Sequence, residues 1–330
     1  MMHLKDLTKK TCFVWGSSLL IALILISFGP ASAAAPAAKK PILVGVLEAK
    51  TGVNASQGIN IIEGVELAFE QIGYKIGDRE VKLVIEDDEY NPEVIKTKTT
   101  KLVERDNVAA IIGPNHSAGA LAVKDYLMAH KVPTLVTMCT TTKLDPGPKN
   151  PYMFRPYINA PLLYYTAGKY CAEKLGYRRA VTVFLDFVAG YENDYPFGLA
   201  FERGGGKVLE RIAIPMGTAN QAPYIAAIKR VKDAEFVNAN LWAGDAVRFV
   251  KSQAELGLGI PITGGDTIVA DGTMLPSLGK DALGIKSYSA YGNVDTPENK
   301  AFVQAYYKKT KKPTKKDTKK AWRRNGSGIR

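Results

Sequence analysis

The sequence is poor in the residues that build metal and catalytic centres. Only three cysteines and three histidines occur among its 330 residues. It also lacks a phosphate-binding glycine loop, a dinucleotide-binding glycine pattern and the Cys/His spacing of a zinc site. We therefore expect no histidine-rich metal centre, and we predict that the protein uses no metal and no cofactor.

An apolar run long enough to cross a membrane is also missing at the amino terminus. The run from Phe13 to Phe28 falls short of the ~20 residues that a membrane-spanning helix needs. Three lysines precede it and Ala31-Ser32-Ala33 follows it, which is the pattern of a secretory signal peptide over residues 1–33. A membrane anchor is the alternative. We predict cleavage after Ala33 and release into the periplasm.

Positive charge is not spread over the body of the chain, although the formal net charge is +12. Residues 308–330 hold eleven Lys or Arg and one acid, and residues 1–33 carry a net +2. The remaining residues, 34–307, hold 30 basic and 30 acidic side chains. A neutral body without a recognition helix or an aromatic-basic stripe predicts that nucleic acid is not a partner.

Cys139 and Cys171 are the two cysteines left after signal cleavage. An oxidising compartment would allow them to pair, and their spacing alone does not decide the matter. We expect two separate, mostly buried thiols.

What the body does contain is an alternation of apolar strands with amphipathic helices, which is typical of parallel α/β layers. Ile62, Val65, Phe69 and Ile72 share one helix face. Asn91-Pro92 predicts a helix start. The strands and helices fall into two sets of βα units, which divide near residues 150–158. The predicted strands are 42–47, 81–86, 108–112 and 133–137 in the first set, and 180–185, 208–214, 235–241 and 260–263 in the second.

Parallel sheets bind ligands beyond the carboxyl ends of their strands, so two facing sheets predict a cleft site. In the first set, Ser117, Thr140 and Thr142 follow strand ends beside helix starts, where hydroxyl and amide groups can hold a carboxylate. The alternative is that they only cap helices.

In the second set, Trp242 and Asp266 follow neighbouring strand ends. A ring face and a carboxylate there can bind a substituted cation. The alternative is a core Trp and a turn Asp. Phe187 and Tyr191 follow another strand end and add apolar wall.

Enzyme interpretations find little support. Residues 113–119 approach a nucleophile elbow, but Asn115 stands where that motif needs glycine. Ser117 next to His116 is sequence adjacency, which does not make a catalytic triad. We therefore predict a binding protein and not an enzyme.

Together these features resemble periplasmic binding proteins of the branched-chain amino-acid type, which serve ABC importers. The similarity runs from about Pro41 to Tyr307. It is carried by these segments in order: Thr51-Gly52, Glu63-Gly64-Val65-Glu66-Leu67-Ala68, Glu86-Asp87-Asp88 with Asn91-Pro92, Ile111-Ile112-Gly113-Pro114, Phe154-Arg155, Glu255-Leu256-Gly257-Leu258 and Gly264-Gly265-Asp266.

The resemblance implies the type I periplasmic binding fold, with two Rossmann-like lobes joined by a three-strand hinge. We expect a first lobe over residues 34–155, a second lobe over 156–285 and an incomplete return to the first lobe over 286–307. The hinge crossings are expected near Met153 to Tyr157 and Ser287 to Gly292, and the third crossing is absent.

The resemblance also implies the ligand contacts. The family serine falls on or beside Ser117, and the segment with backbone and hydroxyl contacts falls on Met138, Cys139 and Thr140. In the second lobe, the family aromatic residue falls on Trp242, and the acid that meets an amino group falls on Asp266. A further family tyrosine is expected near Phe187 to Tyr191, and Gln57 is the position in the first loop.

We therefore predict an extracytoplasmic solute-binding protein that captures an amino acid with a branched-chain, apolar or aromatic side chain. Its expected partners are that solute and an ABC permease in the inner membrane, and we expect a monomer. The alternatives are amide- or urea-like solutes, aromatic carboxylic acids, a ligand-sensing domain on the same fold, and a hydrolase using Ser117.

Beyond Tyr307 the similarity is expected to stop. Residues 308–330, rich in Lys and Arg, lack the apolar content to fold and are expected to be disordered. A truncated or frame-shifted product is the preferred interpretation, and a natural basic tail for surface attachment is the alternative.

Overall fold

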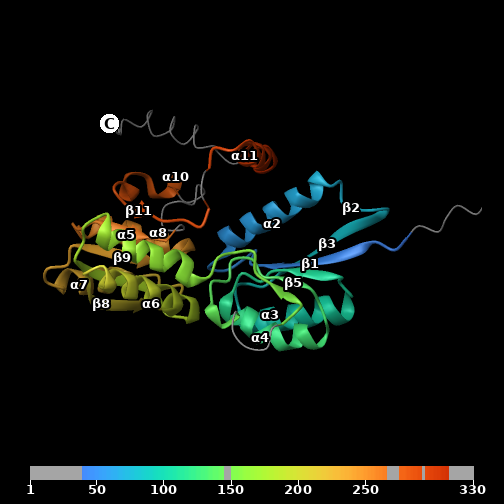
Figure 1. Ribbon diagram of the computed structural model, residues 1–330, viewed down its shortest axis with the longest axis horizontal. Coiled ribbons are helices and arrows are strands. Elements are labelled where there is room, and N and C mark those ends of the chain that lie inside the picture. Colours follow the sequence, from blue (N-terminus) through green and yellow to red (C-terminus); the bar gives the residue numbers. More distant parts are fainter. Residues whose placement is uncertain (1–38, 145–149, 266–274, 292–293, 312–330) are drawn as a thin grey trace, which may run out of the picture. The chain divides into compact units, whose positions relative to one another are not determined.

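The computed structural model describes residues 39–144, 150–265, 275–291 and 294–311. Two lobes follow one another along the chain, each built on its own sheet (Figure 1). Among the described residues, the paired strands are parallel except in one short hairpin, β2 with β3. The predicted α/β class with two parallel-sheet lobes is therefore confirmed.

The sheet of the first lobe has the order β2-β3-β1-β4-β5-β6. Because β1 lies between β3 and β4, the chain changes direction across the sheet beside β1, which is where open parallel sheets bind ligands. The strands are β1 (Ile42–Glu48), β2 (Lys75–Ile76), β3 (Arg79–Asp87), β4 (Ala110–Ile112), β5 (Thr134–Leu135) and β6 (Met153–Phe154).

Helices cover both faces of this sheet. The helix α2 (Ala55–Gln71) lies on one face, and α3 (Pro92–Thr100) and α4 (Ser117–Ala129) lie on the other (Figure 1). A short turn of π-helix, η1 (Lys101–Arg105), continues α3. The core on the α3/α4 face consists of Leu47, Ile95, Leu102, Val108, Ile111, Val123, Leu127 and Val132.

The sheet of the second lobe has the order β11-β10-β9-β7-β8. Here β7 lies between β8 and β9 and repeats the direction change seen at β1. The strands are β7 (Arg179–Leu185), β8 (Lys207–Ile214), β9 (Phe236–Asn240), β10 (Ile262–Gly264) and β11 (Lys286–Ser287). The helical segments are η3 (Pro161–Tyr165), α5 (Thr166–Glu173), α6 (Val188–Arg203), α7 (Ala222–Arg230), α8 (Ala243–Glu255), α10 (Leu275–Leu278) and η4 (Gly279–Ala282).

Strand β7 supplies side chains to two separate cores, because successive residues of a strand point to opposite faces. Val181, Val183 and Leu185 pack with α7 and α8 on one face. Ala180 packs with α5 and α6 on the other face, where Phe197 and Phe201 are fully buried. A strand buried on both faces reads as a continuous apolar run, which is why this one was predictable.

Local signals in the sequence also fix the ends of helices. Asn91 caps α3, since its side-chain oxygen accepts hydrogen bonds from the amides of Glu93 and Val94. At the other end of a helix, Gly204 follows the last residue of α6.

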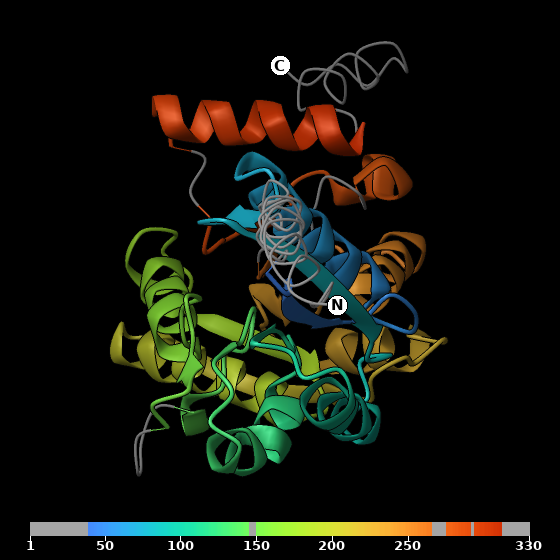
Figure 2. The ribbon, with the colours of Figure 1, turned by 90° about the vertical axis from the view of Figure 1, so that its right-hand side faces the viewer.

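The return segment differs from the prediction at both ends. Strand β11 pairs with β10, so the sheet of the second lobe extends past the expected boundary at residue 285. The helix α11 (Pro297–Thr310) then packs against α2, as Figure 2 shows. The prediction that the chain is disordered from Lys308 onward is wrong for residues 308–310, because α11 continues to Thr310. Lys309 is held there by ion pairs with Glu66 and Glu70.

Cys139 and Cys171 are free and buried, as predicted. Among the described residues, no helix combines the length and apolar character that a membrane crossing requires. The predicted signal peptide, residue Asp266 and residues 312–330 lie outside the described residues.

Candidate functional site

A small cavity lies beside the carboxyl ends of strands from both lobes. Its size suits a compact solute and not an extended chain. The lining residues are Gln57, Tyr90, Asn115, Ser117, Met138, Thr140, Tyr157, Tyr164, Ala189, Asn193 and Trp242.

Five of the eight predicted site residues line this cavity: Gln57, Ser117, Met138, Thr140 and Trp242. They come from separate segments, which the parallel topology brings to one edge of each sheet. Gln57 lies in the first turn of α2, Ser117 opens α4, and Trp242 follows β9 directly before α8.

The first lobe contributes uncharged hydrogen-bonding groups. Ser117 is buried at the start of α4, where helix geometry leaves the first amides without an intrahelical acceptor. Asn54 donates through Nδ2 to Oδ1 of Asn115 at 3.2 Å. This leaves Nδ2 of Asn115 without a partner among the described residues. A buried donor without a partner at the cavity is suited to an acceptor brought by a solute.

A chain of hydrogen bonds joins the lobes at the cavity wall. The hydroxyl of Thr140 donates to Oδ1 of Asn193 at 3.0 Å. Nδ2 of Asn193 donates to the hydroxyl of Tyr164, also at 3.0 Å. A second connection runs from the backbone amide of Thr142 to the carboxylate of Glu192 at 3.2 Å. Thr140 therefore meets both the cavity and α6 of the other lobe.

Cys139 and Phe187 are not among the lining residues. The Cys139 side chain is fully buried, and its thiol donates to the carbonyl oxygen of Pro114 at 3.3 Å. It packs with Ala120 and Val136, and burial raises the pKa of this thiol. It is thus a core side chain behind the wall formed by Met138 and Thr140.

Phe187 instead belongs to a cluster of four rings, which we call the aromatic cluster: Tyr90, His116, Phe187 and Trp242. The ring of Phe187 lies 5.3 Å from that of Trp242 and 5.9 Å from that of His116, between centroids. The predicted apolar wall near Phe187 therefore lies one layer back, supporting Trp242.

Six lining residues were not predicted from the sequence: Tyr90, Asn115, Tyr157, Tyr164, Ala189 and Asn193. Asn115 lies in the segment that approaches an elbow motif without matching it. Tyr90 follows β3, where the acidic residues Glu86, Asp87 and Asp88 carry the family resemblance. Asn193 and Tyr164 lie within helical segments, so no strand-end signal marks them.

The arrangement does not favour nucleophilic catalysis. Nδ1 of His116 accepts a hydrogen bond from the amide of Gly119 at 3.0 Å, which commits one ring nitrogen to capping α4. Burial lowers the pKa of His116 to about 4, so the ring is neutral at pH 7. Within the described part of the chain, no group of three or more metal-ligating side chains comes together.

Comparison with known proteins decides the family. The model of the periplasmic binding protein family matches residues 41–322. This chain belongs to that family. The match extends 15 residues past Tyr307, so the expectation that the similarity stops there is wrong.

Individual relatives agree. The chain is 29% identical over 295 residues to "Leu/Ile/Val-binding protein homolog 6" of Brucella melitensis, covering 86% of this chain and 72% of that protein. An ABC transporter substrate-binding protein from Sphaerobacter thermophilus is 36% identical, with a TM-score of 0.73 over 82% of this chain and 75% of that one. A solute-binding protein of an ABC transporter from R. palustris, solved with benzoate, is 30% identical, with a TM-score of 0.78 over 82% and 74%.

These findings make the chain an ABC-type substrate-binding protein with the type I periplasmic binding fold, and not an enzyme. The lobes, the strand-end cavity and its hydrogen-bonding groups are the features that such a protein needs to hold a small solute.

Proposed function

We propose that this protein is exported, loses residues 1–33, and captures a small aromatic carboxylate of the benzoate type for an ABC permease in the inner membrane. One observation carries the choice of solute. None of the described lining residues is charged, and four of them are aromatic. A flat, apolar ring with one carboxylate matches such a lining.

The carboxylate and the ring of this solute contact different side chains. The carboxylate accepts hydrogen bonds from Ser117 and from the unpartnered Nδ2 of Asn115. The ring lies against aromatic side chains of the cavity wall, among them Tyr90 from the first lobe and Trp242 from the second. The benzoate bound by the R. palustris neighbour supports the same solute class.

A branched-chain or aromatic amino acid is the second candidate, supported by the name of the Brucella relative. Its ammonium group needs an acidic partner, because a buried cation without one is strongly unfavourable. Asp266 lies two positions after Gly264, the last residue of β10, and is the residue proposed for that role.

Calorimetry on protein purified from the periplasmic fraction tests the proposal, with benzoate, 4-hydroxybenzoate, leucine, isoleucine and phenylalanine as titrants. The mass of that protein should correspond to a chain beginning at Ala34. We expect benzoates to bind, and Asp266→Asn to leave their Kd within about twofold. For the amino-acid alternative, Asp266→Asn should weaken binding at least about tenfold. Binding of none of these titrants would refute both solute classes.

A further inference from the structure

Tyr90 enters the cavity from an unusual backbone conformation. Glu89 and Tyr90, directly after β3, have φ angles of 53° and 55°. Left-handed conformations are unfavourable for residues with a Cβ, at about 1 kcal/mol or more each, and persist only where surrounding contacts enforce them. Two in succession need a specific restraint.

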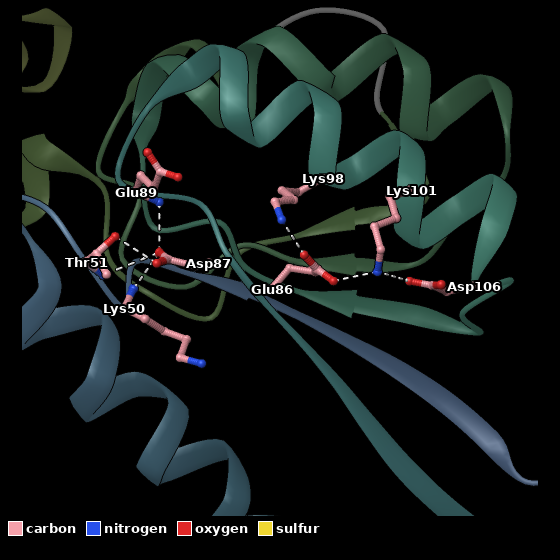
Figure 3. Close-up of polar contacts among 8 residues, drawn as sticks. All are labelled: Lys50, Thr51, Glu86, Asp87, Glu89, Lys98, Lys101 and Asp106. Atoms are coloured by element: carbon pink, nitrogen blue, oxygen red, sulfur yellow. Dashed lines mark hydrogen bonds and ion pairs between the residues drawn. The ribbon is translucent and has the colours of Figure 1, made fainter.

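The restraint comes from two neighbouring carboxylates. Oδ1 of Asp87 accepts a hydrogen bond from the Glu89 amide at 3.0 Å, and Oδ1 of Asp88 accepts one from the Tyr90 amide at 2.8 Å. Asp87 also accepts from the backbone amides of Lys50 and Thr51 and from the Thr51 hydroxyl, as Figure 3 shows. Each left-handed residue therefore has its amide held by its own aspartate.

This backbone conformation places the Tyr90 ring at the cavity and against His116. The ring lines the cavity and packs on His116 with 4.4 Å between centroids. Burial raises the pKa of the Tyr90 hydroxyl, and a hydrogen bond with the Trp242 side chain opposes that shift. Tyr90 in the first lobe and Trp242 in the second lobe thus line the same cavity.

We propose that Asp88 is a positioning residue that fixes the Tyr90 ring as a wall of the solute cavity, and that this wall selects flat aromatic solutes over aliphatic ones. The inference rests on the proposed function, since it assumes that the solute occupies this cavity. Asp88 itself does not line the cavity and acts through Tyr90.

The surroundings of Asp88 make its action depend on pH. Burial raises the pKa of Asp88 to about 6, its hydrogen bond with the Tyr90 amide opposes the shift, and the negative charges of Asp87 and Glu89 add to it. Glu48 at the end of β1 is the other acid that interacts with Asp88. Above pH 6 the carboxylate is a strong acceptor for the Tyr90 amide, and below pH 6 the protonated acid is a weaker one.

A double-mutant cycle with benzoate as the probe tests this. Asp88→Ala should raise the Kd for benzoate about tenfold, and Tyr90→Ala should raise it at least as much. In the Tyr90→Ala background, Asp88→Ala should change the Kd less than about twofold, because the residue it positions is gone. Equal effects of Asp88→Ala in both backgrounds would overturn the proposal.

Two further variants separate positioning from loss of folding. Asp88→Asn keeps a side-chain oxygen that can accept a hydrogen bond from the Tyr90 amide, and it has no proton to lose. We expect its Kd for benzoate to stay constant between about pH 5 and pH 8. That Kd should equal the Kd of the wild type measured below pH 6. Asp106→Ala, at the opposite end of the first sheet, removes an acid paired with Lys101 and should leave the Kd unchanged. A pH dependence of binding that survives in Asp88→Asn would contradict the role of Asp88.

A spectroscopic readout remains informative if benzoate does not bind, which would refute the solute class but not the placement of Tyr90. A chain beginning at Ala34 holds two tryptophans, Trp242 and Trp322, so Trp322→Phe leaves Trp242 as the single reporter. In that background, Asp88→Ala should shift Trp242 emission to longer wavelength, as Tyr90→Ala does, while Asp106→Ala should not. An unchanged spectrum in Asp88→Ala, alongside a shifted one in Tyr90→Ala, would overturn the positioning role.

Discussion

Glu48 is a carboxylic acid without exposed surface at the end of the central strand β1. The hydroxyl of Thr137 donates to its Oε1 at 2.6 Å, and its Oε2 has no partner among the described residues. Burial raises the pKa of Glu48 well above its usual range, the bond from Thr137 opposes this, and the charge of Asp88 adds to it. Burial therefore favours the neutral acid over the carboxylate at this position.

This residue makes folding stability depend on pH. The native state keeps a proton that the unfolded chain releases above about pH 4.3, so stability falls as pH rises from there, by at most about 1.4 kcal/mol per pH unit. Glu48→Gln has the same shape and no proton to lose. We expect urea unfolding near pH 5 and near pH 8 to show the variant gaining stability relative to the wild type at the higher pH. Parallel curves would contradict a buried neutral Glu48.

Most of the elements could be predicted from the sequence, and so could the site residues that follow strand ends. The site residues that lie inside helices could not. Strands such as 180–185 read as apolar runs, and Ser117, Thr140 and Trp242 follow strand ends, so pattern alone located them. Asn193 lies inside α6, where only the tertiary packing shows that its buried amide faces Thr140 and Tyr164.

The directions of the Cys139 and Tyr90 side chains could not be predicted from the sequence either. Met138, Cys139 and Thr140 follow β5 in one short segment, and period alone does not say which of them meets the cavity and which the core. Tyr90 depends on two left-handed residues that are not glycine, which sequence patterns do not anticipate.

Helix α2 approaches β1 so closely that only glycine fits at one position. A Cβ on Gly58 would lie 1.9 Å from the carbonyl oxygen of Ala49, which is backbone and cannot swing away. We expect Gly58→Ala to destabilise the protein by at least about 2 kcal/mol, because helix and strand must move apart. Equilibrium urea denaturation measures the change.

The same helix offers the matched control. A Cβ on Gly64 meets nothing within 4 Å, so Gly64→Ala should stabilise the protein by about 0.5–1 kcal/mol through helix propensity. The second lobe repeats the close approach, since a Cβ on Gly190 of α6 would lie 1.8 Å from the carbonyl oxygen of Leu185. Similar effects of Gly58→Ala and Gly64→Ala would show that close packing is not what Gly58 provides.

Charge over the whole molecule is divided in a way that leaves the site neutral. Residues 34–307 balance their charges, and the net positive charge lies at the two ends of the sequence. At the start of the basic carboxyl-terminal region, Lys309 forms ion pairs with Glu66 and Glu70 of α2, which compensate its charge. Selection of the proposed carboxylate solute would therefore come from local hydrogen bonds in the cavity and not from a long-range positive field.

The two lobes should respond to solute as one unit, because the cavity has lining residues from both. A solute that contacts Ser117 in one lobe and Trp242 in the other must be released before either lobe can unfold. At a benzoate concentration of 100 times the Kd, hydrogen exchange in both central strands, β1 and β7, should slow by up to about 100-fold. Mass spectrometry of peptides covering 42–48 and 179–185 measures both rates, and protection confined to one strand would place the solute in a single lobe.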